Sequence, residues 1–270
     1  MACMAEPESL ARLRRRLAGA VGTVDSMHPL GGTAYLVEVG GRRLVAKLGP
    51  GCRDEAEGLR RLGAAPGGPP IPDVVFEETD LLVTAAVDQM PRNAGHDEAL
   101  GRDLARLHQT TFPHWGGGSS WVGVCPVDPA AQTDSPAFYG ARLLGLSARC
   151  ALEHVVSPVV AKLDQLLPPG GPVLAHGDLW WGNVLFGSDG RSWLIDPSVH
   201  GGHAEEDLAM LALFGAVPDR LHRAYAEVQP LHSGWEERVP LFQLAPLLVH
   251  AVLFGGGYRA EVEAAARRFA

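Results

Sequence analysis

The first third of the chain carries short runs of β-forming residues separated by turn residues. Residues 34–39 and 43–48 are rich in Val and Leu and flank a Gly-Gly pair at residues 40–41. Two such runs around a Gly-Gly pair predict a β-hairpin. A second pair of strands is predicted at residues 73–76 and 81–84.

Helical spacing of apolar residues dominates the remainder of the chain. Leu100, Leu104 and Leu107 recur at intervals of four and three, which predicts a helix over residues 97–109. The other predicted helices are residues 6–20, residues 53–63 with Gly63 as the C-terminal cap, residues 137–167 and most of residues 204–270. Residues 113–136, rich in Gly, Pro, Ser and Trp, are expected to be irregular, and residues 173–196 are strand-like.

This order of elements predicts an α+β protein with two lobes. The N-terminal lobe, residues 1–88, is expected to be small and built on antiparallel β-structure. The C-terminal lobe, residues 89–270, is expected to be larger and mainly helical. A cleft between two lobes is a common place for a small ligand.

Composition narrows the classes of partner. The net charge is −8, and no segment carries a basic stripe, so we expect no nucleic-acid partner. The densest basic cluster, Arg12 and Arg14 to Arg16, is typical of a solvated helix face. No apolar run approaches the roughly 20 residues needed to cross a bilayer, so no membrane segment is expected.

The same composition predicts a cytoplasmic protein. Glu6 and Glu8 interrupt the start of the chain, which lacks the apolar core of a secretion signal. The four cysteines are scattered without a C-x-x-C pair, which argues against a zinc site or a disulfide framework and favours free thiols in a reducing compartment. These cysteines are Cys3, Cys52, Cys125 and Cys150.

The most informative segment is LAHGDLWWGNVLFGSDGRSWLIDPS, residues 174–198. Two β-rich runs flank Asp189-Gly190, a pair typical of a type I′ hairpin turn. A turn centred between these two residues pairs Asn183 with Asp196 at the open end of the hairpin. An amide oxygen and a carboxylate meeting there are ligands that Mg²⁺ accepts, with phosphates completing its shell.

Asp178 lies five residues before Asn183, in the loop that leads into the same hairpin. A carboxylate there can accept the proton of an attacking hydroxyl and orient it. Taken singly, Asp178 is also typical of a loop cap, Asn183 of a strand-end turn and Asp196 of a strand end. The three together, at these spacings, indicate phosphoryl transfer.

The spacing is that of the protein-kinase catalytic loop, in which a base Asp precedes a metal-binding Asn by five residues. The forms H-G-D at 176–178 and I-D-P at 195–197 resemble the aminoglycoside-phosphotransferase branch of that fold. The longer string H-G-D-L-W-x-G-N resembles the fructosamine kinase (ketosamine 3-kinase) family. So do four further strings: EAEGL (55–59), LARLH (104–108), EEDLAML (205–211) and LFGGGY (253–258).

This resemblance implies a protein-kinase-like fold that uses ATP and Mg²⁺ to phosphorylate the 3-hydroxyl of a ketosamine, the adduct of a sugar with an amine. The acceptor is expected to be a small ketosamine or a glycated side chain of a protein. In the family the phosphorylated adduct releases the amine, so the implied role is repair of glycated amines. The resemblance also makes Trp180 and Trp181 candidate substrate contacts, with packing as the alternative for Trp180. It makes Asp207 a brace for the catalytic loop, and a helix N-terminal acid favoured by the macrodipole is the alternative. His176 is expected to support the loop backbone rather than act as a base.

Several residues of the N-terminal lobe are predicted to bind the nucleotide. Lys47 in V-A-K matches the kinase strand lysine that contacts α- and β-phosphates, although a strand lysine is also typical of a solvated face. Glu55, eight residues later, is the expected partner of Lys47, with Glu57 as its rival. Gly31-Gly32-Thr33 is expected before the first strand as a short phosphate-facing turn, and a plain turn is the alternative.

The adenine contact is expected at the junction between the lobes. Thr84, Ala85, Ala86 and Val87 resemble the strand that enters the kinase hinge, where backbone groups bind the adenine edge. An ordinary buried strand is compatible with that role.

Two other functions stay open from the sequence. The acceptor is an aminoglycoside, choline or another amino-alcohol in the first alternative. In the second, the chain binds a nucleotide without catalysis. Intact Lys47, Asp178, Asn183 and Asp196 argue against the second.

Overall fold

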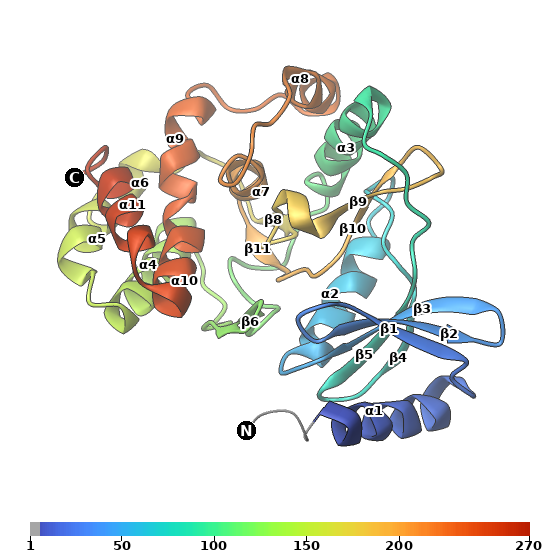
Figure 1. Cartoon of the computed structure of the whole chain (residues 1–270). Helices are drawn as coiled ribbons and strands as arrows, with labels where there is room; N and C mark the ends of the chain where they lie inside the picture. Colours follow the sequence, from blue (N-terminus) through green and yellow to red (C-terminus); the bar gives the residue numbers. More distant parts are fainter. Residues whose placement is uncertain (1–5) are drawn as a thin grey trace.

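The computed structural model describes residues 6–270 and has two lobes (Figure 1). Cys3 lies outside the described residues. The small lobe is a five-stranded antiparallel sheet with strand order β1-β2-β3-β5-β4. Its strands are β1 (Ser26–Gly31), β2 (Ala34–Val39), β3 (Arg42–Leu48), β4 (Val74–Glu77) and β5 (Leu81–Ala85). The four predicted strands are therefore confirmed to within a residue.

Strand β1 is an element that the sequence pattern missed. Ser26, His28 and Pro29 interrupt its apolar alternation, and its register with β2 shifts between Pro29 and Gly31. A strand that carries proline and little apolar surface belongs at a sheet edge, where β1 lies. The Gly31-Gly32-Thr33 turn consequently joins the first two strands instead of preceding the first.

Helices cover both faces of the sheet (Figure 1). Helix α1 (Glu6–Val21) packs Leu13 and Leu17 against Val37 and Leu44 of the sheet. Helix α2 (Cys52–Gly63) packs Ala56 and Leu59 against Leu82 from the other side. The predicted glycine cap of α2 is wrong: Gly63 is its last helical residue, and Ala64 caps it with φ −81°. A right-handed exit of this kind needs no glycine.

The large lobe is mainly helical. Its helices are α3 (Ala94–Leu107), α4 (Ser135–Arg149), α5 (Glu153–Val160), α6 (Leu163–Leu166), α7 (Ala204–Leu211), α8 (Asp219–Val228), α9 (Trp235–Phe242), α10 (Leu244–Phe254) and α11 (Gly257–Ala266). Short strand pairs join β6 (Trp121–Val122) to β7 (Cys125–Pro126), β8 (Val173–Ala175) to β11 (His200–Gly202), and β9 (Val184–Phe186) to β10 (Ser192–Leu194). Residues 113–134 are thus irregular apart from β6 and β7, and the predicted irregular segment ends two residues earlier than expected, because α4 begins at Ser135.

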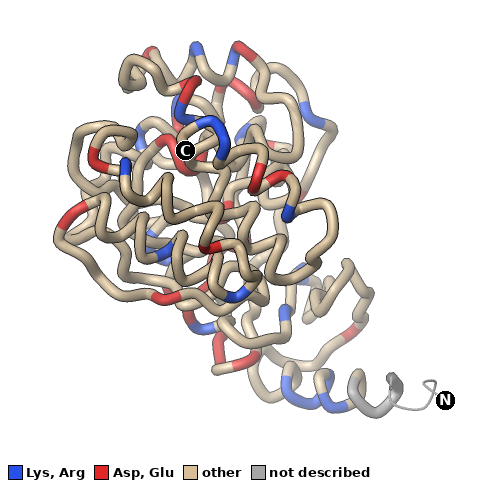
Figure 2. The backbone as a smooth tube through the Cα atoms, turned by 90° about the vertical axis from the view of Figure 1, so that its left-hand side faces the viewer, with Lys and Arg blue, Asp and Glu red and all other residues tan. Residues whose placement is uncertain are grey.

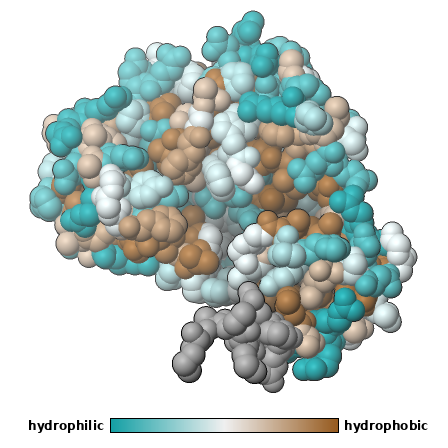
Figure 3. All heavy atoms as spheres, viewed as in Figure 1, coloured by the Kyte–Doolittle hydropathy of each residue, from teal (hydrophilic) through white to brown (hydrophobic). Residues whose placement is uncertain are grey.

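The lobes are joined through residues 86–93, which pass beside the β9–β10 hairpin. Met90 N–H donates to the Phe186 carbonyl at 2.9 Å, and Ser188 N–H donates to the Asp88 carbonyl at 2.8 Å. The surface is hollowed between the two lobes (Figure 3). The division of the chain into two lobes at residue 88 stays a prediction.

Charges of both signs are interspersed along the tube in Figure 2, with a basic run on α1. Part of that run forms ion pairs: Arg16 Nη2 lies 2.6 Å from Glu78 Oε2 and 2.6 Å from Asp80 Oδ1. The basic run therefore helps to hold α1 against the β4–β5 turn.

One segment of the described residues is long and apolar enough to cross a membrane. Trp235–Phe254, which comprises α9 and α10, has a mean hydropathy of 1.3. Phe242, Leu244 and Leu248 of this segment lie in the core that α4 also lines. These residues of the segment are thus packed as in a core helix of a globular protein.

Candidate active site

The β9–β10 hairpin carries two of the predicted site residues, with a register that differs from the predicted one. Ile195 N–H donates to the Asn183 carbonyl at 3.1 Å, so Asn183 faces Ile195 and not Asp196. Gly190 has φ +80°, whereas Asp189 is not left-handed as a type I′ turn requires. The Asp189 carboxylate accepts from Arg191 N–H at 3.0 Å instead, and this side-chain contact selects the longer turn.

Asp196 reaches the cleft through its backbone conformation. Its φ is +54°, the left-handed region that Asp adopts at a cost of roughly 1–2 kcal/mol. Its carboxylate Oδ1 lies 3.1 Å from Lys47 Nζ on the facing lobe. Asp196, one position beyond the paired residues of the hairpin, thereby points toward Lys47 across the cleft.

Asp178 and Asn183 are held together by direct hydrogen bonds. Asn183 Nδ2 donates to the Asp178 carbonyl at 2.8 Å and lies 3.4 Å from the Asp178 carboxylate. Burial, reinforced by repulsion from Asp196, raises the pKa of Asp178 to about 7. The three oxygen-bearing residues of the predicted centre therefore converge.

Lys47 links this centre to the small lobe. Its Nζ lies 2.7 Å from Glu55 Oε2 on α2, while the rival Glu57 pairs with Arg61 at 2.9 Å. Burial opposes the charge on Lys47, but Glu55 and Asp196 outweigh it and raise the pKa of Lys47. Burial and then Asp196 raise the pKa of Glu55, against the lowering effect of Lys47.

The H-G-D loop rests on Asp207 of α7. The Asp207 carboxylate accepts from His176 N–H at 2.8 Å and Gly177 N–H at 2.9 Å, and lies 3.1 Å from His108 Nε2. Gly177 has φ +80°, and a Cβ there would lie 2.1 Å from the Ser198 carbonyl oxygen. Only glycine fits this position of the loop.

His176 is fully buried and bonds backbone on both sides. Its Nδ1 accepts from Asp178 N–H at 3.3 Å, and its Nε2 lies 3.0 Å from the Ile195 carbonyl oxygen. Burial lowers the pKa of His176, which favours the neutral ring that this pattern requires. The contacts are those of a residue that positions the loop.

The turn Gly31-Gly32-Thr33 is the exposed tip of the β1–β2 hairpin. Both glycines have positive φ, +127° and +54°, and a Cβ at either would meet no atom within 4 Å. Thr33 anchors the turn to β3, since its hydroxyl and its carbonyl both bond the Leu48 backbone.

The junction strand offers fewer free backbone groups than predicted. Ala85 N–H donates to the Asp73 carbonyl at 2.9 Å, and Ala86 N–H donates to the Arg43 carbonyl at 3.0 Å. These two donors are occupied by the sheet. Thr84 also pairs within the sheet. Of the four predicted residues, Val87 is therefore the first whose backbone the sheet does not occupy.

The two candidate tryptophans have different surroundings. Trp180 is 40% exposed, and its ring lies edge-on to Phe214 with centroids 6.2 Å apart. Trp181 packs against the core of the large lobe, and the Arg92 guanidinium lies 3.8 Å from its ring centroid. Trp180 is the more exposed of the two candidate substrate contacts, and Trp181 is partly buried against the core, with a buried ring N–H that has no hydrogen-bond partner among the described residues.

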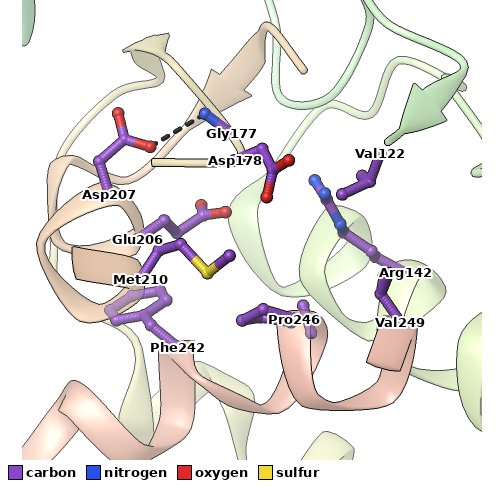
Figure 4. Close-up of a pocket in the computed structure, with 11 residues that line it drawn as sticks. Val122, Arg142, Gly177, Asp178, Glu206, Asp207, Met210, Phe242, Pro246 and Val249 are labelled. Carbon is purple, nitrogen blue, oxygen red and sulfur yellow. Dashed lines mark hydrogen bonds between the residues drawn. The ribbon is translucent and has the colours of Figure 1, made fainter. Parts of the chain in front are cut away.

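A small pocket opens beside Asp178 in the large lobe (Figure 4). Its polar lining is Asp178, Arg142, Glu206 and Asp207, and its apolar lining includes Met210 and Pro246. The sequence patterns missed Arg142, which lies within a predicted helix without any motif. Glu206 could have been found, because it precedes Asp207 in EEDLAML.

The donor set suits Mg²⁺. Asn183 and Asp196 supply an amide oxygen and a carboxylate, and residues 6–270 contain no group of three or more His, Cys, Asp or Glu that could hold a metal. Mg²⁺ at nucleotide sites uses one or two protein carboxylates and takes its other ligands from phosphates and water. A site of two protein ligands beside Lys47 fits this pattern.

The lobes and the groups that face their cleft define a class of protein. A strand lysine paired with a helix glutamate faces a catalytic loop in which an Asp, an Asn and a second Asp converge. This is the architecture of a protein-kinase-like, ATP-dependent phosphotransferase.

Comparison with known proteins then identifies the family within this class. The profile of the family described as "Fructosamine kinase" matches residues 51–269, so the chain belongs to the fructosamine kinase family. A Thermus thermophilus protein named "Probable ketoamine kinase" is 34% identical over 259 residues, which are 93% of this chain and 95% of that protein.

Two further relatives extend this picture. The Arabidopsis thaliana "Protein-ribulosamine 3-kinase, chloroplastic" is 32% identical over 61% of this chain and 54% of its own. A crystal structure described as "putative fructosamine-3-kinase" from Thermobifida fusca superposes with a TM-score of 0.87 at 36% identity, covering 95% of this chain and 97% of that one. The family resemblance and the two-lobed fold inferred from the sequence are thus confirmed.

Proposed function

We propose that this enzyme transfers the γ-phosphoryl group of ATP to the 3-hydroxyl of ketosamines, the fructosamine or ribulosamine adducts of amines and proteins. The observation that carries the proposal is the convergence of Asp178, Asn183 and Asp196 with Lys47 across the cleft. Membership of the fructosamine kinase family supplies the acceptor class.

Asp178 is the proposed catalytic residue. Its carboxylate orients the acceptor hydroxyl and accepts the proton as the hydroxyl oxygen attacks the γ-phosphorus. The bond from the γ-phosphorus to the bridging oxygen breaks, and its electron pair leaves with ADP. A raised pKa suits Asp178 to proton transfer near neutral pH.

The nucleotide is held from both lobes in this proposal. Lys47, oriented by Glu55, contacts the phosphates. Asn183 and Asp196 would hold Mg²⁺, which would supply positive charge to the phosphate oxygens. The Gly31-Gly32-Thr33 turn directs backbone N–H groups at the phosphates. Adenine binds backbone groups at the Thr84 to Val87 junction, chiefly at Val87.

The biological role that we propose is deglycation in the cytoplasm. Phosphorylation of the 3-hydroxyl makes the adduct labile, so that the amine is released. His176 and Asp207 support the loop, and Trp180 lines the acceptor side. Neither a nucleic acid nor a membrane takes part.

The proposal is tested by measuring ADP formation with a panel of acceptors. Fructose-lysine, ribulose-lysine and a glycated protein test the ketosamine class, and choline and an aminoglycoside test the amino-alcohol alternative. Phosphate recovered on the 3-hydroxyl of a ketosamine is the expected result. Transfer only to an amino-alcohol, or to no acceptor, would overturn the proposal.

A further inference from the structure

Arg142 places a guanidinium in the pocket beside Asp178. It projects from α4 toward the Asp178 carboxylate (Figure 4). Its Nη1 lies 3.1 Å from His200 Nε2, whereas its buried Nε has no hydrogen-bond partner. Among residues 10–270, no carboxylate forms an ion pair with Arg142. The side chain therefore keeps donors available on the pocket side.

Buried polar groups surround this guanidinium. His200 Nε2 lies 3.1 Å from Arg142 Nη1 and 3.1 Å from Glu206 Oε2, and this one nitrogen cannot accept from the first and donate to the second. Glu206 Oε1 accepts from His203 N–H at 2.7 Å. Burial disfavours the charge on Glu206, but His200, Arg142 and His203 outweigh it and lower the pKa of Glu206. A carboxylate therefore faces the same pocket as Arg142 and attracts its guanidinium.

We propose that Arg142 binds oxygen atoms of the sugar part of the ketosamine and so determines acceptor specificity, with Glu206 as a positioning residue whose charge attracts the guanidinium. The inference rests on the proposed function, since it assigns a second point of contact to the same acceptor. Arg142 and Asp178 face one pocket, so a sugar whose hydroxyl meets Asp178 presents its other oxygens to Arg142.

The lining of this small pocket suits the oxygens of a neutral polyol better than it suits an anion. Asp178, Glu206 and Asp207 line it against the one guanidinium, so its net charge disfavours a phosphate or a carboxylate. Its wall also contains Met210 and Pro246. A sugar offers oxygen acceptors to a guanidinium and C–H groups to such a wall.

The guanidinium orients the acceptor within this acidic pocket. The amine of a ketosamine is cationic near neutral pH, so it is disfavoured directly beside Arg142. The sugar oxygens therefore face Arg142, and the amine end lies away from it, toward the exposed rings of Trp180 and Phe214, whose faces attract cations.

The decisive variant is Arg142→Met, with Arg149→Met as its matched control. Arg149 ends the same helix but bonds the Pro126 carbonyl outside the pocket. Loss of charge-assisted hydrogen bonds predicts that KM for fructose-lysine rises about 10- to 100-fold in Arg142→Met. KM for ATP and the thermal midpoint are expected to change little, and the control is expected to behave as the native enzyme.

Two further variants separate binding from folding. Arg142→Lys keeps the charge without the planar fork, so it is expected to recover part of the affinity for fructose-lysine. Glu206→Gln is expected to raise KM for fructose-lysine less than Arg142→Met does, with KM for ATP unchanged. An unchanged KM for fructose-lysine in a folded Arg142→Met enzyme overturns this inference alone. A native enzyme that phosphorylates no ketosamine overturns the proposed function.

Discussion

The two lobes present their functional groups to the cleft in different ways. In the small lobe, Lys47 projects from β3, a strand paired on both sides, and salt bridges to Glu55 and Asp196 orient it. In the large lobe, Asp178 lies in a loop held by buried side-chain contacts to backbone, above all those of Asp207 and His176.

This difference indicates how sensitive the geometry of each half of the site is to substitutions. A sheet positions Lys47 through many backbone bonds, so single substitutions nearby leave its place unchanged. The H-G-D loop depends on a few buried acceptors, and each one that is lost leaves donors unpaired at about 1–3 kcal/mol. The large lobe is therefore expected to lose geometry before the small lobe does.

The largest effect is expected from Asp178→Asn. Without the carboxylate, kcat for a ketosamine falls about 10²- to 10⁴-fold, because proton acceptance is lost. ATP affinity, measured by calorimetry, stays near the native value. Asp164→Asn, exposed on α6, is the control. Undiminished turnover would remove Asp178 from the mechanism.

The small-lobe counterpart is Lys47→Met. Loss of its charge-assisted contacts lowers kcat/KM for ATP about 10- to 100-fold, through KM for ATP as well as kcat. The chain holds one other lysine, Lys162, so Lys162→Met is a matched control. Equal KM values for ATP in both variants would contradict the assignment of Lys47 to the phosphates.

Asp207→Asn tests the brace beneath the catalytic loop. One amide oxygen cannot replace the carboxylate for His176 N–H, Gly177 N–H and His108 together, so stability falls by about 1–3 kcal/mol. Denaturant unfolding measures this loss, and kcat is expected to fall with KM for ATP little changed. A variant with native stability and native kcat would show that the brace is dispensable.

Acidification is expected to weaken the α7 region through His203. Burial lowers the pKa of His203 to about 4, below the value of about 6.5 in an unfolded chain. The unfolded chain therefore binds the proton first, and stability falls as pH drops from about 6.5 toward 4. This amounts to about 2 kcal/mol between pH 7 and pH 5.

His203→Gln supplies the comparison for that effect. The difference between native and variant unfolding free energies isolates the contribution of His203 from those of other titrating groups. A shallower decline between pH 7 and pH 5 is expected in the variant. Parallel curves would mean that His203 titrates alike in the folded and unfolded chains.

The smallest effect is expected at the exposed turn. Gly32→Ala adds a Cβ that meets no atom within 4 Å but strains a φ of +54°. We expect KM for ATP to rise by a factor of about three or less, at a strain of roughly 1–2 kcal/mol. Gly19→Ala in α1, where space is also open, is the control. A change in acceptor KM instead would place the turn outside the nucleotide site.

The catalytic hairpin shows how much of the site the sequence pattern predicts. The motif predicted that Asp178, Asn183 and Asp196 meet, and they do, although by a different route. The predicted turn would have paired Asn183 with Asp196, whereas the observed register pairs Asn183 with Ile195. The side chain of Asp189 and the left-handed backbone of Asp196 decided this, and neither follows from spacing.

The sequence by itself determined the order of the elements, the lobe composition and the motif residues. Local periodicity, turn residues and short spacings carry this information, because each depends on neighbours along the chain. The pairing of Lys47 with Glu55 was already the expectation from the sequence, and the structure has it. Only the tertiary structure decided that Trp181 packs against the core and that Arg142 joins Asp178 in one pocket. Those outcomes depend on contacts between segments far apart in the chain, where packing and burial choose the partner.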